Sequence, residues 1–411
     1  MGTDATTEDE ELISFDQARS RVLADVRRLG AERVPVPDAV GRVLAEDLIA
    51  REPLPPFDHS AMDGYAVATG DLSADGPWSL EVAGESAAGS EPTWLARDAA
   101  CRIFTGAPLP DRADAVLMQE RVTRDGDTLR FDVRPKPGQN VRRAGEDLAR
   151  DAVAMTAGMR LTAGGLALAA MLGRADLPVS RRPIVTIVCT GDELRAPGEA
   201  ARPGSIPESN SAPLAALARQ AGADVRVAPI ARDEPRATQR AVEQALAGTD
   251  VLLTVGGVSV GDHDVVRPAL ERAGVKLDFW RVAIKPGKPL AFGRSGGVRV
   301  LGLPGNPASA IVTFVLFGMP LLRAMQRDAR PAPMLVHVRM GAARKRSPDR
   351  LELVRAMLQL DGGRLTARVH DNQSSGSATS LASSDGLAFV PAGDEAIPAG
   401  AFVDFLRWSD A

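Results

Sequence analysis

The chain is poor in cysteine, and this shortage narrows the classes of protein to consider. Its 411 residues include two cysteines, Cys101 and Cys189, which lie far apart and outside any CxxC pair. A disulfide framework is therefore not expected, and a reduced, cytoplasmic protein is the natural interpretation. Cys189 lies within an apolar run and is expected to be a small core residue.

Aromatic content and charge both argue against a nucleic-acid partner. Phe, Trp and Tyr together make up 4% of the residues, so no series of stacking side chains is available. The net charge is -4 and the isoelectric point is about 5.8. The arginines are scattered among acidic residues instead of forming a basic stripe, so no nucleic acid is expected to bind.

No targeting or membrane-spanning segment is expected. The first residues, MGTDATTEDEE, are acidic where a signal peptide is basic and apolar. Gly2 and Thr6 match the myristoylation pattern, but no polybasic segment follows, and we interpret residues 1–11 as a disordered tail. The longest apolar run, residues 308–325, contains Pro320 and is short for a bilayer, so it is expected to be a buried helix.

The other segments of the chain are expected to be arranged around the stretch from 250 to 270, DVLLTVGGVSVGDHDVVRPAL. Its apolar, β-branched run at 251–255 is typical of a strand buried on both faces of a parallel sheet. A loop follows the run and leads into a helical pattern at 264–273. The loop carries the small and acidic residues Gly256, Gly257, Ser259, Gly261, Asp262 and Asp264.

This order of elements predicts an anion site. Exposed backbone N–H groups and the helix dipole favour negative charge at a helix start, and glycine allows close approach. The acidic residues of the loop fit if a divalent cation with oxygen ligands lies between carboxylate and phosphate. The alternative is a tight strand-to-helix turn with an aspartate N-cap. The loop matches neither GxGxxG nor the Walker A pattern.

Neighbouring segments favour the functional interpretation. Residues 183–190 form a second apolar run that leads into Asp192 and Glu193, and residues 298–303 form a third. Between them, 279–292 carries Lys285 and Lys288. Loops at the carboxyl ends of parallel strands converge on one crevice, so carboxylates and lysines are expected together. Such a group suits phosphate chemistry with a metal ion.

The remaining segments suggest an elongated, multidomain chain. Residues 12–29 have helical spacing, with Ser14 and Gln17 as a capping box. Residues 53–67 are extended and polar, and 72–132 read as short strands separated by turns, one of which contains Thr105. Residues 330–411 form a second β region with a hairpin turn at 362–363. Its Ser-rich stretch at 372–384 is either a flexible loop or a hydroxyl-rich loop at a ligand.

The α/β part of the chain is expected between residues 182 and 327. Its helices are placed at 209–222, 234–247, 264–273 and 307–325 by their apolar spacing. Ser209 or Asn210 is a plain N-cap on the simplest interpretation, and Asp233 is then a helix N-terminal acid. Another helix, around LTAGGLALAAMLG, is expected to start at Thr162 and end at Gly173.

Five segments together resemble a known family. SAMDGYA, TGDEL, GGVSVGDHD, AIKPGKP and GLPGNPASA occur in this order and are similar to motifs of the molybdopterin molybdenumtransferase family, which is related to the E domain of gephyrin. The resemblance extends from about residue 15 to 404. It implies an α/β and β multidomain fold. The implied parts are an elongated α+β domain (12–52 with 142–180), an inserted β domain (53–141), a mostly parallel α/β molybdopterin-binding domain (181–329) and a C-terminal β-barrel-like domain (330–411).

The resemblance also implies an activity and a site. The family joins molybdate to adenylylated molybdopterin and releases AMP, in a homodimer whose site lies between the α/β domain and the inserted β domain of the other subunit. The implied catalytic residues are Asp63, Thr105, Glu193, Asp233, Asp264, Lys285 and Lys288. The implied ligand-binding residues are Gly256, Gly257, Ser259, Gly261, Pro304, Gly305, Asn306, Pro307 and Ser375. Glu193 and Asp264 are the expected ligands of Mg²⁺.

Further expectations follow from the same resemblance. Arg350, Arg355 and Ser375 match charged and hydroxyl positions near the family's cleft. The expected partners are molybdopterin adenylyltransferase and acceptor molybdoenzymes or their chaperones. Glu208 departs from the family, which often has aspartate in a D-x-N arrangement where this chain has ESN. Neither His59 nor His263 is expected to bind metal.

Two other functions compete with molybdenum transfer. One is adenylylation of molybdopterin by a related α/β domain, which the extra β domains and SAMDGYA argue against. The other is a gephyrin-like scaffold that binds without turnover. A binding protein of that kind would not need Asp63, Lys285 and Lys288, so the transferase is the preferred interpretation.

Overall fold

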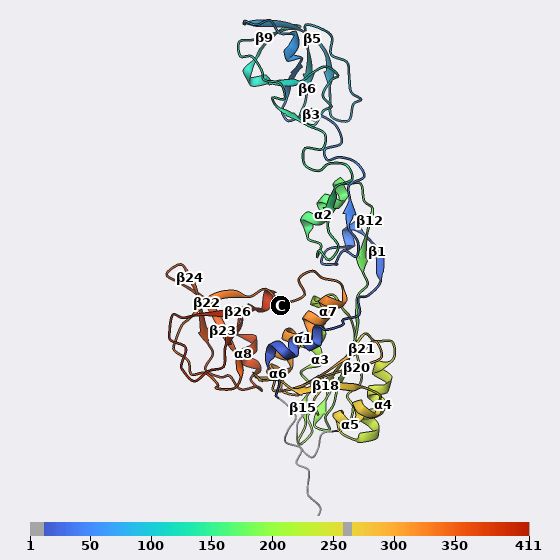
Figure 1. The fold of residues 1–411 in the computed structure, drawn as a ribbon, viewed down its shortest axis with the longest axis vertical. Helices are drawn as coiled ribbons and strands as arrows, with labels where there is room; N and C mark the ends of the chain where they lie inside the picture. Colours follow the sequence, from blue (N-terminus) through green and yellow to red (C-terminus); the bar gives the residue numbers. More distant parts are fainter. Residues whose placement is uncertain (1–11, 258–264, 411) are drawn as a thin grey trace, which may run out of the picture.

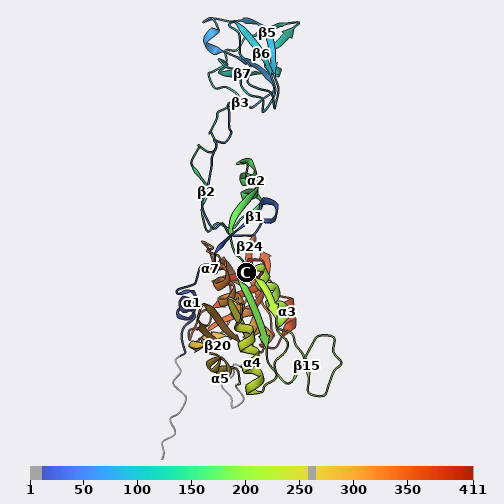
Figure 2. The same ribbon diagram turned by 90° about the vertical axis from the view of Figure 1, so that its right-hand side faces the viewer.

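Short apolar runs form the middle of a six-stranded sheet in the α/β domain. The computed structural model describes residues 12–257 and 265–410, and shows an elongated chain with this domain near one end (Figures 1 and 2). The strand order is β16-β13-β17-β21-β20-β18. The first four strands are parallel, and β20 and β18 are antiparallel to their neighbours. The strands are β13 (Ile184–Cys189), β16 (Asp224–Val227), β17 (Val251–Val255), β18 (Lys276–Arg281), β20 (Pro289–Ser295) and β21 (Val298–Leu303).

Helices cover both faces of this sheet. Four helical segments lie within a few residues of the predicted positions: α3 (Ser211–Gln220), α4 (Pro235–Leu246), α5 (Val266–Arg272) and Pro307–Met325. Alternate residues of β17 enter different cores: Leu253 packs with Pro307–Met325, and Leu252 packs with α4 and α5. This alternation explains why the runs are apolar throughout.

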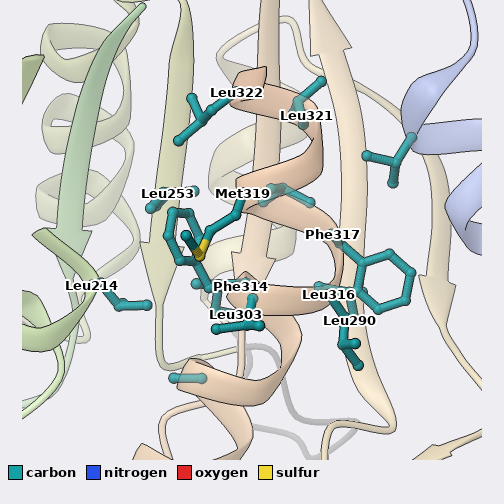
Figure 3. Close-up of a cluster of buried hydrophobic side chains, with 14 of the residues drawn as sticks. Leu214, Leu253, Leu290, Leu303, Phe314, Leu316, Phe317, Met319, Leu321 and Leu322 are labelled. Carbon is teal, nitrogen blue, oxygen red and sulfur yellow. The ribbon is translucent and has the colours of Figure 1, made fainter. Parts of the chain in front are cut away.

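The segment Pro307–Met325 is the central helix of the larger core. It consists of α6 (Pro307–Thr313), a π-helical turn η4 (Phe314–Gly318) and α7 (Met319–Met325). It is long and apolar enough to cross a membrane, but 83% of its most apolar window is buried within the protein. Figure 3 shows its side chains packed against strands of the sheet, which confirms the prediction of a buried helix.

The first helix is shorter than predicted. Helix α1 (Phe15–Leu23) begins with the predicted capping box, in which Ser14 and Gln17 exchange two hydrogen bonds of 2.9 and 3.2 Å. It ends six residues before the predicted end because Ala24 is extended and Asp25 has a φ of 50°. It packs against the central helix, with the rings of Phe15 and Phe317 5.5 Å apart.

A small region built from two distant stretches separates the α/β domain from the inserted β domain (Figure 1). Strand β1 (Ala31–Pro35) pairs with β12 (Asp176–Ser180), and β2 (Leu48–Ile49) pairs with β11 (Val153–Met155). The turn η1 (Val36–Asp38) and helix α2 (Ala163–Met171) complete it. As predicted, α2 is capped by the Thr162 hydroxyl, which accepts a hydrogen bond from the Gly165 N–H at 3.3 Å.

The inserted β domain lies at the far end of the molecule in both views (Figures 1 and 2). Its six-stranded sheet has the order β7-β4-β6-β5-β9-β8. The strands are β4 (Gly64–Val67), β5 (Trp78–Ser86), β6 (Ala99–Ile103), β7 (Ala115–Met118), β8 (Thr123–Asp125) and β9 (Thr128–Phe131). Turns η2 (Thr69–Asp71) and η3 (Gln119–Arg121) connect them, and β3 (His59–Ser60) pairs with β10 (Val141–Arg142) at the base.

The C-terminal domain is a closed barrel beside the α/β domain. Its strands are β22 (Val336–Met340), β23 (Leu351–Asp361), β24 (Arg364–Val369), β25 (Gly386–Val390) and β26 (Phe402–Arg407), followed by the turn η5 (Trp408–Asp410). The β23–β25 pairing closes it, and β19 (Ile284–Lys285) of the α/β domain pairs with β23. The predicted turn at 362–363 is confirmed. The Ser-rich stretch is not a plain loop, because it contains helix α8 (Ala378–Ala382), capped by Ser377.

Candidate active site

Three strand ends meet at one edge of the central sheet. Strands β13, β17 and β21 run in register, so Cys189 lies beside Val255, and Val255 beside Leu303. The loops after them are therefore in contact. A Cβ atom on Gly305 would lie 3.5 Å from the Gly256 Cα atom, and one on Gly256 would lie 2.7 Å from the Thr190 carbonyl oxygen. The predicted convergence of loops is confirmed.

Two buried polar atoms at this edge have no hydrogen-bond partner among the described residues. They are the Thr190 hydroxyl and the Asn210 side-chain oxygen, in residues that are 4% and 7% exposed. The Asn210 amide group donates to the Gly305 carbonyl at 2.8 Å, which directs Asn210 toward the loop junction. A buried, unsatisfied polar atom is costly, so these two atoms indicate a polar ligand.

Glu208 serves as the helix cap that the sequence analysis assigned to Ser209 or Asn210. One of its carboxylate oxygens accepts hydrogen bonds from the N–H groups of Asn210 (2.6 Å) and Ser211 (2.9 Å), while Asn210 makes no side-chain cap. Burial alone would raise the pKa of Glu208, but the hydrogen bonds from Ser211 and Asn210 outweigh it and lower the pKa. The departure from the D-x-N arrangement is therefore accounted for by a buried, ionised cap.

Acidic side chains gather beside the end of β13. The Asp233 N–H donates to an Asp192 carboxylate oxygen at 3.3 Å. Burial raises the pKa of Asp233, and the charges of Glu193 and Asp192 raise it further, against the lowering effect of a hydrogen bond from the Asp192 backbone N–H. Asp233 precedes α4 by two residues, so it lies at the N-terminal end of that helix as well as beside Asp192.

A cleft of about 870 Å³ opens next to this acid group. It extends from Gly191 and Asp192, past Glu208, to Arg232. Its lining also includes Arg195 of β14 (Leu194–Arg195) and Arg202 of the loop that leads to β15 (Ile206–Pro207). The volume lies within the usual range for pockets that hold small ligands and cofactors.

A basic region lies where the barrel meets the α/β domain. Lys285 and Lys288 are both exposed. The Lys285 ammonium is 2.8 Å from a Glu352 carboxylate oxygen, and the Lys288 ammonium has no partner in the described part of the chain. The loop that carries them packs on the first turns of the central helix, because a Cβ on Gly287 would lie 2.5 Å from the Thr313 methyl group.

Arg355 lies in this region and is almost fully buried. It is 1% exposed, and its Nε and Nη1 atoms have no partner within the described residues. Its Nη2 atom donates to the Ser374 carbonyl at 3.0 Å. The neighbouring Ser375 carbonyl accepts from the Ala308 N–H at the start of the central helix (3.1 Å). A buried guanidinium with open donors, held by a loop that contacts a helix N-terminus, has the chemistry to bind an oxyanion.

Three comparisons place these features in a family. Matches to family models cover residues 13–173 (MoeA N-terminal region, domain I and II), 186–324 (probable molybdopterin binding domain) and 337–408 (MoeA C-terminal region, domain IV). The chain belongs to the MoeA family. This membership confirms the resemblance and the predicted α/β and β multidomain fold.

Individual relatives and a solved structure support the same assignment to the MoeA family. The molybdopterin molybdenumtransferase of Haemophilus influenzae is 40% identical over 319 residues, which are 77% of this chain and 78% of that protein. The enzyme of the same name from Bacillus subtilis is 33% identical over 402 residues, 96% of this chain and 94% of that protein. The crystal structure of a molybdopterin biosynthesis MoeA protein from Pyrococcus horikoshii has a TM-score of 0.84 at 29% identity, covering 97% of this chain and 100% of that one.

Asp63 and Thr105 form a pair in the inserted β domain of this MoeA chain. The Thr105 N–H and hydroxyl both donate to one Asp63 carboxylate oxygen, at 2.8 and 2.9 Å. These two hydrogen bonds lower the pKa of Asp63. Figure 1 shows the domain far from the α/β domain, so a single chain does not bring this pair to Glu193 or Lys285.

Some predicted site residues lie outside the described part. Ser259, Gly261, Asp262 and Asp264 are among residues 258–264, which the structure does not describe. Among the residues that are described, no three His, Cys, Asp or Glu side chains are close enough together to hold a metal ion.

The other residues singled out in the sequence lie at the loop junction, in the barrel and in the inserted domain. Pro304, Gly305, Asn306 and Pro307 join β21 to the central helix, next to Gly256. Arg350 lies beside Asp349, with 3.5 Å between their charged atoms. His59 contacts the Phe57 carbonyl at 3.3 Å in the inserted domain. The sequence analysis missed Thr190 as a candidate, although it directly precedes Gly191 in the TGDEL motif.

Proposed function

We propose that this chain transfers molybdenum from molybdate to adenylylated molybdopterin and releases AMP. The observation that carries the proposal is the buried Arg355, whose Nε and Nη1 donors are open, in the barrel strand that pairs with the strand of Lys285. Such a group suits a doubly charged tetrahedral oxyanion, because several cations share its charge in a place with little water. The curated relatives described above carry the name of this activity.

The cleft next to the acid group is the proposed position of the pterin part of the substrate. Among its lining residues, Asp192, Arg195 and Glu208 offer partners to the polar groups of a pterin. The Gly256 and Gly257 backbone, with φ angles of 94° and 61°, allows a phosphate to approach the start of the following loop. The substrate would thus extend from the cleft toward the oxyanion region.

The donor set also fits a magnesium ion bound partly by substrate. Mg²⁺ usually keeps several waters and takes one or two carboxylates together with phosphate oxygens, so a complete protein cage is not required. Glu193 and Asp233 would hold it from the described part, with Asp264 as the further predicted ligand. When bound, the ion would polarise the pyrophosphate for cleavage. Burial is the main cause of the raised pKa of Asp233, and the negative charges of Glu193 and Asp192 add to it, so a cation would relieve their repulsion.

A second copy of the chain is part of the proposal. Asp63 and Thr105 are remote from the cleft within one chain, so they contribute only if another copy supplies them (Figure 2). Helix α2 supports this arrangement, since it is apolar on all sides and its Ala167, Ala170 and Met171 are exposed. A helix that is apolar all round is normally buried, so a homodimer contact is proposed for this face. A cytoplasmic location is also proposed, and the two free, buried cysteines fit a reducing compartment.

Single-turnover AMP release tests the activity. Purified chain is mixed with adenylylated molybdopterin and Mg²⁺, with and without molybdate, beside a Lys285→Ala variant. Molybdate-dependent AMP release that the variant loses supports the transferase. Tight substrate binding without AMP release in the unmodified chain contradicts it and favours a binding protein without turnover.

A further inference from the structure

A buried carboxylate of the barrel contacts one lysine of the basic region. Strands β19 and β23 pair in parallel with Lys285 directly opposite Glu352. The Lys285 ammonium is 2.8 Å from Glu352 Oε1. The Glu352 side chain is 8% exposed and the Lys285 side chain is 55% exposed. The carboxylate is thus fixed inside the protein, while the lysine extends from it toward solvent.

A second cation holds the other oxygen of the same carboxylate. Arg344 Nη2 lies 3.3 Å from Glu352 Oε2. Arg344 is itself fixed, because its backbone exchanges two hydrogen bonds with Ile397, of 2.8 and 2.9 Å. With one oxygen facing each cation, Glu352 cannot turn away from Lys285 without leaving a buried charge unpaired.

The ion pair leaves part of the Lys285 ammonium available. An ammonium group has three N–H donors, and the contact with Glu352 uses one of them. The other two are open to solvent or to a ligand at this exposed position. Lys288 differs, since none of the described residues holds its ammonium. Of the two lysines, only Lys285 has a fixed direction before a ligand binds.

The partner of Lys285 and the buried arginine of the oxyanion region belong to one strand. Glu352 and Arg355 are both in β23, three positions apart. The odd spacing places their side chains on opposite faces of the strand, since Glu352 pairs with Val390 of the barrel core and Arg355 pairs with Leu387 of the core shared with the central helix. The link between Lys285 and molybdate therefore depends on the position of this lysine where the barrel meets the α/β domain. Fixing a flexible lysine in advance removes the entropy that ligand binding would otherwise have to overcome.

We propose that Glu352 is a positioning residue for molybdate, acting through Lys285 at the boundary between the barrel and the α/β domain. This rests on the proposed function. Glu352 does not contact the oxyanion in this account. Its carboxylate keeps the Lys285 ammonium in the direction from which two N–H groups donate to molybdate, and Arg344 keeps the carboxylate in place.

The test compares Glu352→Gln, Glu352→Asp and a control, Asp361→Asn, which removes an exposed charge at the hairpin tip of the same barrel. Molybdate dependence of single-turnover AMP release and calorimetric molybdate binding are measured for each. In Glu352→Gln, the molybdate concentration for half-maximal rate and the dissociation constant are expected to rise about tenfold, while the saturating rate falls less than about threefold. Glu352→Asp keeps a carboxylate and is expected to recover most of the affinity, and Asp361→Asn to match the unmodified chain.

A double-mutant cycle with Lys285→Ala separates positioning from a structural role. If Glu352 acts through Lys285, adding Glu352→Gln to Lys285→Ala should weaken molybdate binding by less than about twofold more. A full tenfold loss in that background, or unchanged affinity in Glu352→Gln alone, would overturn the proposal. Absence of molybdate-dependent release from the unmodified chain would instead contradict the proposed function, so the two failures are distinguishable.

Discussion

Replacing Arg355 with methionine is expected to stabilise the free protein while abolishing its response to molybdate. Arg355 is 1% exposed and has two guanidinium nitrogens without partners. Each unsatisfied buried donor costs about 1–3 kcal/mol. The substitution also loses the bond of 3.0 Å to the Ser374 carbonyl, a charge-assisted contact that contributes about 1.5–3 kcal/mol. Because Ser374 is exposed, water replaces that donor.

The difference between these contributions sets the expected magnitude. Methionine fills much of the same volume without a charge, so a net gain of about 1–2 kcal/mol in unfolding free energy is expected for the variant. The unmodified chain should gain about 2.7 kcal/mol at a molybdate concentration one hundred times the dissociation constant. The variant should gain nothing from the same addition.

Urea denaturation with and without molybdate measures both effects. Unfolding midpoints of the two proteins are compared at fixed protein concentration, with sulfate as a control anion. A variant that is less stable than the unmodified chain by more than about 1 kcal/mol would refute the claim that Nε and Nη1 of Arg355 lack partners in the free protein. A variant still stabilised by molybdate would refute its assignment to the oxyanion region.

Three further predictions concern the strand edge. Glu208→Ala is expected to lose about 1–2 kcal/mol of unfolding free energy at neutral pH, since Glu208 caps α3. Because the folded state lowers the pKa of Glu208, this contribution is present above the ordinary glutamate pKa and disappears as the pH falls through the folded-state pKa. Denaturation of both proteins at neutral and acid pH measures the effect. Asp233→Asn should be slightly more stable than the unmodified chain at neutral pH, by less than about 0.5 kcal/mol because the group is solvated. A raised carboxyl pKa means that the folded state holds its proton longer, so only the unmodified chain should lose stability as pH rises through that pKa. Gly256→Ala should lower the unfolding free energy by about 2–4 kcal/mol, because its Cβ would lie 2.7 Å from a carbonyl oxygen at a φ of 94°. Gly204→Ala is the control: its φ is 74° but the space around it is open, so it should lower the unfolding free energy by about 1–2 kcal/mol in the same denaturation experiment.

The sheet and its loops could be predicted because their signals are local. Apolar runs followed by glycine and acidic residues mark the ends of buried parallel strands, and the structure places Thr190, Gly256 and Gly305 together there. The capping box at Ser14 and the cap at Thr162 likewise depend on a few adjacent residues. Such features depend on short-range geometry, which spacing along the chain determines.

The missed features depend on contacts between distant residues. Helix α1 ends at Leu23, and the buried Arg299 donates to the carbonyl of Asp25 from the neighbouring sheet. The cap on α3 comes from Glu208 because its carboxylate reaches forward to two N–H groups, a role that the sequence alone leaves open between several residues. The ion pair of Lys285 and Glu352 joins two domains, so no local pattern predicts it.

The family resemblance suggested a role for residues of a second chain, which neither the spacing of residues nor the structure of a single chain can indicate. The pair Asp63 and Thr105 is held together by two hydrogen bonds, yet it lies far from the cleft in Figure 1. A local pattern of residues gives no information about a partner chain. The proposal that these residues act on the substrate of another copy therefore depends on the dimer and is open to a direct test.

Mixing two inactive variants tests that central claim most directly. Asp63→Asn and Lys285→Ala are purified separately, unfolded and refolded together to exchange subunits, and assayed for molybdate-dependent AMP release. In a mixed dimer one site carries both substitutions and the other carries neither, so a one-to-one mixture is expected to recover about a quarter of the unmodified activity. Recovery at that level supports a site assembled from two copies. No recovery, with mixed dimers demonstrated by mass, would contradict it.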